Sequence, residues 1–244
     1  MNRDTTLSKY SPQVYARLGG ILYLIIIVAG LSSEFFFRGK LIVANNPAAT
    51  ANNLIASEPL WRIGILVEYL SLICTIVLAM IYFFLLRPVH KNLNLLATFF
   101  RLISIIVQVV AVLNLTAALF PLISQGTNKA FTSEQVYSLT NFAIKSHSFG
   151  YSISLLFLGC CFFVHGYLIF KSGFLPKLLG ILIQIAGIGY LTNSFTLILA
   201  PKLTAWTFPI IILPVLVGET SLSLWLLIKG VDVNNWELKQ SQNS

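Results

Sequence analysis

The sequence predicts an all-helical protein, a polytopic bundle of six transmembrane helices that forms a single membrane domain over residues 1–244. Three observations lead to this fold class. Hydrophobic residues make up 57% of the chain and charged residues only 10%, whereas a soluble domain carries about 25% charged residues. The mean hydropathy is +0.83. The apolar residues also form runs that are long enough to cross a hydrocarbon core about 30 Å thick.

The predicted spans are separated by short polar or Pro-containing segments, and polar tails are expected at 1–17 and 229–244. The first span has an alternative, because Leu18 to Leu31 has the length of the apolar region of a signal peptide. Phe35 to Phe37 extend the apolar stretch past any cleavage site, which favours a span. The six predicted spans are 18–37, 63–86, 102–123, 148–170, 178–199 and 207–228.

The segments between the spans carry their own signals. In the loop 38–61, Pro47 is expected to open a short helix that ends before Pro59. The apolar stretch 93–124 is too long for one crossing, so its first part, Leu93 to Phe100, is expected to lie at the membrane interface. Ser133 is expected to start a helix that leads into the fourth span.

The net charge of +8 raises the question of a nucleic-acid partner. The basic residues are scattered between apolar runs and form no patch or stripe, so the sequence predicts no nucleic-acid binding and favours the lipid bilayer as partner. Cys74, Cys160 and Cys161 lie within apolar runs, where cysteine behaves as a small hydrophobic residue. Their spacing is not that of a metal site or a disulfide framework, and the sequence predicts no cofactor.

The basic residues also predict the orientation of the chain. Six crossings place both termini on one side, and the positive-inside rule assigns the side with more Lys and Arg to the cytoplasm. Both termini are therefore predicted to be cytoplasmic, in a multi-pass protein of the inner cell membrane. The predicted cytoplasmic segments hold Arg3, Lys9, Arg17, Arg87, Lys91, Arg101, Lys171, Lys177, Lys229 and Lys239.

The clearest family signature lies between Lys145 and Gly180. Residues in this region and in its flanks resemble the bacterial membrane family catalogued as domain of unknown function 4386. The resemblance covers nearly the whole chain and implies a multi-spanning membrane protein without an assigned activity, so it offers no catalytic residues. The chain departs from the family at Asn45-Asn46, where members often have Gly-Asp. The matching motifs are His147, Gly166-Tyr-Leu168, Lys171-Ser-Gly-Phe-Leu-Pro176, Gly187-Ile-Gly-Tyr-Leu191, Arg17-Leu-Gly-Gly-Ile-Leu-Tyr23 and Leu86-Arg-Pro-Val89.

Ionisable residues at membrane depth are the main functional evidence, because placing one there costs at least about 2.5 kcal/mol. Glu34 and Arg38 are four residues apart, as are Glu58 and Arg62, and this spacing lets a helix pair them on one face. Both pairs fall at the outer ends of predicted spans. They are either ion pairs that lock helix ends or the rim of a binding site.

Two further carboxyl groups, Glu68 and Glu219, have no local partner. Glu219 lies near the middle of the sixth predicted span, close in depth to Asn114 and five residues after Pro214, which bends a helix. One interpretation is a protonated Glu219 that hydrogen-bonds to a neighbouring helix. The other is a proton or cation site beside a broken helix, as in secondary transporters.

The histidines of the fourth span do not form a site of their own. His147 and His165 lie about 27 Å apart along one helix, so they cannot share a metal. A metal site would need His147 together with Glu34, Glu68 or Glu219 from other helices, and the alternative is an interfacial His147 bonded to a loop carbonyl. The sequence therefore predicts no metal and leaves the catalytic residues unknown.

Small residues predict the surfaces on which helices pack closely, because they let two backbones approach each other. They recur on one face of the fourth span and on one face of the fifth. The members of these two faces are His147, Gly150 and Ser154, and Gly180, Gln184 and Gly187.

The favoured functional hypothesis is a small-solute or ion-coupled carrier, supported by Pro209, Pro214 and Glu219 in one span. The alternatives are an intramembrane enzyme that acts on a lipid-like substrate at the outer leaflet and a structural or accessory subunit. The expected partners are the bilayer and a small molecule or ion, and a homo-oligomer is left open. The candidate site is a polar cluster in the outer half of the bundle made of Glu34, Arg38, Arg62, Glu68, Asn114, His147, Asn193 and Glu219.

Overall fold

The structure, a computed structural model, describes residues 11–124 and 131–242, and its regular elements in these segments are helices. Six helical stretches are long and apolar enough to cross a membrane. The prediction of an all-helical bundle with six spans is confirmed. These spans are Pro12–Leu41, Glu58–Leu86, Lys91–Ile123, Ser133–Ser172, Lys177–Leu199 and Ile210–Ile228.

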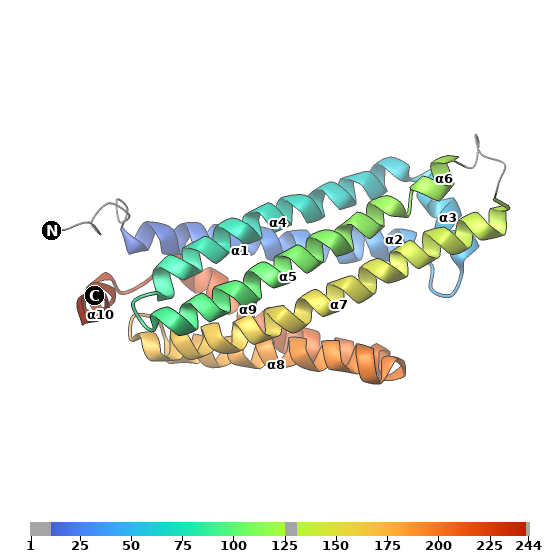
Figure 1. Ribbon diagram of the computed structural model, residues 1–244. Helices are drawn as coiled ribbons and strands as arrows, with labels where there is room; N and C mark the ends of the chain where they lie inside the picture. Colours follow the sequence, from blue (N-terminus) through green and yellow to red (C-terminus); the bar gives the residue numbers. More distant parts are fainter. Residues whose placement is uncertain (1–10, 125–130, 243–244) are drawn as a thin grey trace.

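The spans are continuous helices except for the first and third, which are built from more than one element (Figure 1). In the first span a π-helical segment, η1, separates α1 from the short α2. The elements in order are α1 Pro12–Ser32, η1 Ser33–Arg38, α2 Gly39–Leu41, α3 Pro47–Ala56, α4 Glu58–Leu86, α5 Lys91–Ala117, α6 Phe120–Ser124, α7 Ser133–Ser172, α8 Lys177–Leu199, η2 Pro201–Leu203, α9 Thr204–Ile228 and α10 Val233–Gln242.

Two helices, α3 and α7, begin where the sequence predicts, and each start is stabilised by a capping residue. Asn46 caps α3, where its side chain accepts a hydrogen bond from the amide of Ala49 at 2.9 Å, and Pro47 is the first helical residue. Thr132 and Gln135 form a reciprocal capping box at the start of α7. The helices predicted to open at Pro47 and at Ser133 are both present.

The helices are longer than the predicted spans. α7 has 40 residues, which is about 60 Å and roughly twice the thickness of a hydrocarbon core. Leu93 to Phe100, which are expected at the membrane interface, belong to α5, which runs unbroken from Lys91. The predicted tail 229–244 contains α10. Of the residues used to predict orientation, Arg3 and Lys9 lie outside the described segments.

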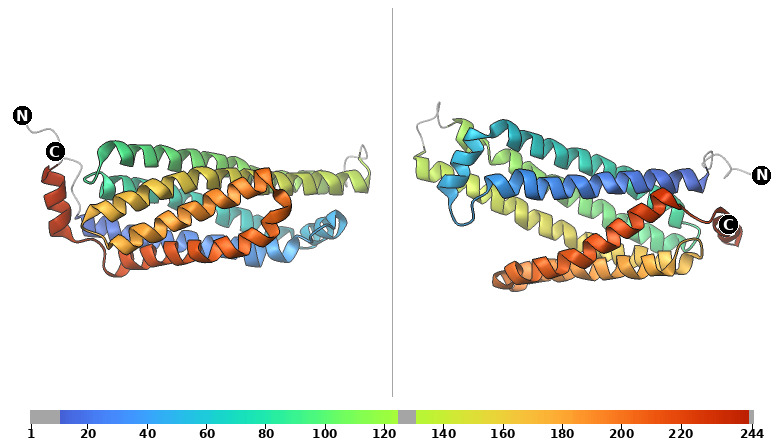
Figure 2. Two further views of the ribbon diagram at one scale, coloured as in Figure 1. Left: turned by 90° about the horizontal axis from the view of Figure 1, so that it is seen from below. Right: turned by 180° about the vertical axis from the view of Figure 1, so that it is seen from behind.

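The six spans form a closed ring in which each helix packs mainly against two neighbours. The order around the ring is α1, α4, α5, α7, α8, α9 and back to α1. The start of α1 and the end of α9 lie at the same end of the ring, and α10 lies across this end (Figure 2). We call it the α10 end and the opposite one, where α3 and α6 lie, the α3 end (Figure 1).

The α7–α8 contact is close enough to require glycine on both helices. A Cβ atom added to Gly180 would lie 2.6 Å from the carbonyl oxygen of Gly166, and one added to Gly166 would lie 2.6 Å from the carbonyl oxygen of Gly180. Only glycine fits at either position, since both obstacles are backbone atoms. The close contact places the two helices in a fixed register.

Each end of the ring is closed by hydrogen bonds to main-chain groups. At the α10 end, Trp236 of α10 donates to the carbonyl of Leu85 at 3.0 Å, and the Gln13 side chain bonds to the carbonyl of Lys229 and the amide of Val231, both at 2.9 Å. At the α3 end, Trp61 donates to the carbonyl of Leu115 at 3.0 Å. The buried apolar side chains accordingly form two cores, one near each end.

Candidate functional sites

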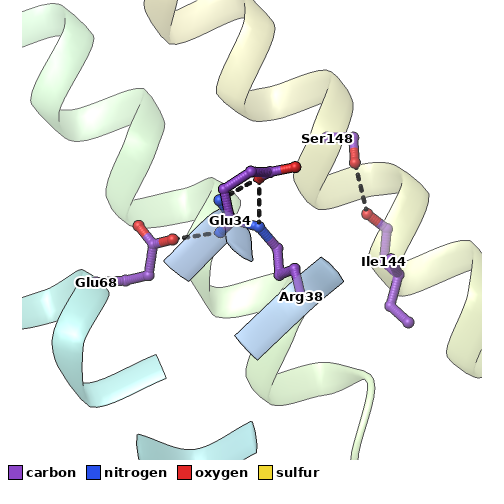
Figure 3. Close-up of polar contacts among 5 residues, drawn as sticks. All are labelled: Glu34, Arg38, Glu68, Ile144 and Ser148. Atoms are coloured by element: carbon purple, nitrogen blue, oxygen red, sulfur yellow. Dashed lines mark hydrogen bonds and ion pairs between the residues drawn. The ribbon is translucent and has the colours of Figure 1, made fainter. Parts of the chain in front are cut away.

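The first candidate site is centred on Arg38, the last residue of the π-helical segment η1. Its Nε and Nη2 atoms both donate to Oε2 of Glu34, at 3.2 and 3.0 Å. Its Nη1 atom forms an ion pair with Glu68 of α4. Figure 3 shows the guanidinium between the two carboxylates. We call Glu34, Arg38 and Glu68 the Arg38 site.

Burial makes the two ion pairs unequal. The side chains of Arg38 and Glu68 are 15% and 8% exposed, whereas that of Glu34 is 55% exposed. The Glu34 side chain is thus only partly covered by protein, unlike its partner. The Glu68 carboxylate is buried, and the guanidinium is its ion-pair partner among the described residues. A buried charge without a partner is costly, so Glu68 depends on Arg38.

A small cavity adjoins the buried pair. Its volume is about 10 Å³, which is close to the space that one water molecule needs. Ser33 is one of its lining residues, and the buried Ser33 hydroxyl has no hydrogen-bond partner among the described residues. The lining residues are Ser33, Phe37, Arg38, Trp61, Gly64, Ile65, Glu68 and Leu115.

His147 of α7 lies near this site without joining it. The side chain is buried, it interacts electrostatically with Arg38, and its ring stacks against Tyr151 with centroids 6.1 Å apart. Its Nε2 atom has no hydrogen-bond partner among the described residues. Within the described segments, no hydrogen bond or ion pair joins His147 to a carboxylate. Ser148, also on α7, is satisfied within its helix by the carbonyl of Ile144 at 3.3 Å (Figure 3).

Three other residues of the predicted cluster lie apart from the Arg38 site. Arg62 pairs with Glu58 at 2.7 Å as the spacing predicts, but both side chains are exposed. Asn114 donates to the carbonyl of Val110 in its own helix at 3.0 Å. Asn193 is buried in α8, and its Oδ1 atom has no partner among the described residues.

The eighth predicted residue, Glu219, belongs to a second candidate site. Its Oε1 atom accepts a hydrogen bond from the hydroxyl of Tyr190 at 2.5 Å. Glu219 is 8% exposed and forms no ion pair with any described residue. It interacts electrostatically with Tyr23 and Tyr82 across the ring. The hydrogen bond joins α9 to α8, and Tyr23 of α1 and Tyr82 of α4 lie in the vicinity of Glu219.

His165 extends this second site along α7. The ring of Tyr82 lies 5.3 Å from the ring of His165 and 6.3 Å from that of Tyr23, measured between centroids. The Nδ1 atom of His165 contacts Sγ of Cys161 at 3.5 Å. We call Tyr23, Tyr82, His165, Tyr190 and Glu219 the Glu219 site.

Sequence reasoning missed four of these five residues as site members. The tyrosines and His165 lie inside apolar runs, where no local spacing separates a residue that faces a site from one that packs against a neighbour. The two sites lie at different levels, because Glu68 is 18 residues and Glu219 nine residues from the α10 ends of their helices. These spacings correspond to roughly 27 and 14 Å. Tyr151 of α7 is close enough to interact electrostatically with both carboxyl groups.

The chemistry of the sites is acid–base and ionic. Within the residues that the structure describes, no group of three or more His, Cys, Asp or Glu side chains is placed to hold a metal ion. The Arg38 site offers carboxylates and a guanidinium beside a water-sized space, and the Glu219 site offers one carboxyl among phenols and an imidazole. The fold and these sites define a multi-pass membrane protein with ionisable groups buried at two levels of a six-helix ring.

The comparisons with known proteins identify the family. The chain belongs to the family described as domain of unknown function (DUF4386), whose model matches residues 18–230. It is 30% identical over 167 residues to an uncharacterized protein of Archaeoglobus fulgidus, in an alignment that covers 66% of this chain and 80% of the relative. No solved structure gives a significant match. The resemblance that the motifs indicate is therefore confirmed, and it assigns no activity.

Proposed function

We propose that this protein is a carrier or binding protein for a small solute or an ion, and that the Arg38 site is its binding site. The observation that carries the proposal is the buried ion pair between Arg38, on the π-helical segment η1, and Glu68 of α4, with a cavity beside it. Buried ionisable residues in membrane spans are typical of substrate and ion pathways. π-helical turns inside α-helices occur frequently at functional sites.

The charges of the site favour a positively charged ligand. Two carboxylates face one guanidinium, so the site carries one more negative than positive charge. A cation or an amine that approaches through the exposed Glu34 competes with Arg38 for the carboxylates. The cavity has about the volume of one water molecule, so a larger solute requires η1 or α4 to move.

We also propose that the α10 end faces the cytoplasm and that the Arg38 site opens to the outside of the inner membrane. The distribution of Lys and Arg along the chain supports this orientation. The Arg38 site lies toward the α3 end, so its ligand arrives from outside the cell.

Ligand retention by the purified protein tests the proposal. The protein is purified in lipid nanodiscs, and the small molecules it retains are identified by mass spectrometry. Its thermal unfolding is then followed with sodium chloride, potassium chloride, ammonium chloride, amino acids and choline chloride. A ligand at 100 times its dissociation constant stabilises the folded protein by about 2.7 kcal/mol.

Two substitutions separate binding at this site from a general salt effect. Glu68→Gln removes the buried carboxylate, and Glu58→Gln is the matched control in an exposed pair. We expect one compound to raise the melting temperature of the wild type and of Glu58→Gln but not of Glu68→Gln, and to accumulate in proteoliposomes that contain the wild type. If no compound is retained and none raises the melting temperature, the structural-subunit alternative replaces the carrier.

A further inference from the structure

The Glu219 site contains buried polar atoms that the protein itself does not satisfy. The hydroxyls of Tyr23 and Tyr82 and the Nε2 atom of His165 have no hydrogen-bond partner among the described residues. The three residues are only 3%, 8% and 5% exposed. An unpaired buried polar atom costs about 1–3 kcal/mol, and most such atoms in folded proteins are paired with protein or with ordered water. Three of them in one chain of neighbouring rings indicate a shared hydrogen-bonding ligand.

The carboxyl group of Glu219 determines which ligand fits. It is buried and forms no ion pair with any described residue, unlike Glu68. Burying an ionised carboxylate without a cationic partner is costly, and proteins avoid that cost by binding a proton. Tyr190 donates its hydroxyl hydrogen to Oε1, which leaves Oε2 as the oxygen that binds the proton. The carboxyl group is thus a proton acceptor inside the ring.

The surrounding groups argue against a metal cation. Besides Glu219, the site offers phenol hydroxyls and an imidazole, and the guanidinium of Arg101 is close enough to interact electrostatically with Glu219 and His165. The positive charge of Arg101 disfavours a second cation, whereas a water molecule is able to hydrogen-bond to a carboxyl group, to phenol hydroxyls and to an imidazole. The charged and titratable groups that interact electrostatically with Glu219 come from the five other helices of the ring and are Tyr23, Tyr82, Arg101, Tyr151 and Tyr190.

Three of the five site residues lie at successive depths toward the α10 end. Glu219 is nine residues from the α10 end of its helix, His165 seven and Tyr82 four. At 1.5 Å per residue these positions are roughly 14, 10 and 6 Å from the helix ends. His165 is able both to accept and to donate a proton. The series therefore runs from the carboxyl group toward one face of the membrane.

We propose that the Glu219 site binds a proton, and that ordered water between Glu219, Tyr23, Tyr82 and His165 exchanges this proton with the α10 side of the membrane. The Oε2–H bond of Glu219 forms as an O–H bond of a protonated water breaks, and no electron is transferred. The proton site stands independently of the carrier. The proposed function is needed only for one further step, in which the proton bound at Glu219 serves as the coupling ion of the carrier.

Infrared difference spectroscopy on the full-length protein in nanodiscs tests the proposal without a transported substrate. A protonated buried carboxyl group gives its own C=O stretching band. We expect a band that is present at low pH, disappears as the pH rises and is lost in Glu219→Gln. Glu134→Gln, at the exposed start of α7, is the matched control and keeps the band. A spectrum in which Glu219→Gln retains every band of the wild type overturns the proposal.

Hydration is tested by exchange into D₂O. We expect the Glu219 band to shift promptly in the wild type and severalfold more slowly in Tyr82→Phe, which removes one hydroxyl from the proposed path. Equal exchange rates overturn the path through Tyr82. If Glu219→Gln does not fold, Tyr190→Phe replaces it, and loss of the 2.5 Å hydrogen bond must move the band to higher frequency. An unmoved band overturns the assignment.

A final measurement separates a proton from an alkali cation. Choline chloride is replaced by sodium or potassium chloride at constant pH. A proton site keeps its band, whereas loss of the band shows that a cation displaces the proton and overturns the proposal. This outcome is independent of the ligand tests at Glu68, so a failed carrier hypothesis and a failed proton site give different results.

Discussion

The Arg38 site and the Glu219 site place a buried carboxyl group in the same ring of helices by different means. Glu68 is held by a charged partner, and its site is made of three charged side chains from the first and second spans. Glu219 accepts a hydrogen bond from a neutral partner, Tyr190, and the rest of its site is made of phenols and an imidazole from other helices. The comparison shows that the partner of a buried carboxyl group, and not its depth alone, determines whether it is suited to hold a charge or a proton.

The largest change in stability is expected when the ion pair of the Arg38 site is broken. Arg38→Met leaves Glu68 buried without its cationic partner and is expected to lower the free energy of unfolding by about 3–5 kcal/mol. The double variant Arg38→Met with Glu68→Leu removes both charges and is expected to recover most of this loss. Unfolding in detergent, titrated with sodium dodecyl sulfate, measures both values. A double variant as unstable as Arg38→Met would show that packing, rather than charge pairing, holds this site together.

The next effect concerns the helix contact beside the neutral site. Gly180→Ala places a Cβ atom 2.6 Å from the carbonyl of Gly166 and 2.7 Å from the amide nitrogen of Phe170. Because these are backbone atoms, α7 and α8 must separate, and we expect a loss of about 1–3 kcal/mol. Gly30→Ala is the control, since a Cβ atom there meets nothing within 4 Å, and it is expected to raise helix stability by up to about 1 kcal/mol. The same unfolding titration measures both, and equal effects would contradict the close contact.

The two sites also differ in how far the sequence predicts them. The spacing of Glu34 and Arg38 predicts their ion pair, because residues four apart meet on one helix face. Nothing local predicts the pair between Arg38 and Glu68, which depends on how α1 and α4 pack. For Glu219 the sequence gives its depth along one helix, but depth does not identify the neighbouring helix that supplies Tyr190. A tyrosine or neutral histidine ring costs little free energy within an apolar run. Its position in the sequence therefore does not indicate whether it belongs to a site.

The number of membrane spans was predictable from the lengths of the apolar runs alone. The apolar runs must match the hydrocarbon core, so their number determines the number of spans. The ends of the helices were less predictable, because backbone hydrogen bonding continues beyond the apolar run wherever capping residues allow it. In α1 the helix begins at Pro12, capped by Ser11, six residues before the predicted span. The ring order of the helices depends on close contacts such as that of Gly166 and Gly180, whose partners no single helix reveals.

The smallest expected effect compares two ion pairs that have the same spacing. Arg62 and Glu58 are four residues apart, like Arg38 and Glu34, but their side chains are 55% and 39% exposed. Exposed ion pairs contribute about 0–1 kcal/mol, so Arg62→Ala is expected to change the free energy of unfolding by no more than this. Ligand binding at the Arg38 site is expected to be unchanged. If Arg62→Ala instead weakens binding as strongly as Glu68→Gln, the site extends to the rim of the second span, and burial is not what separates a functional pair from a structural one.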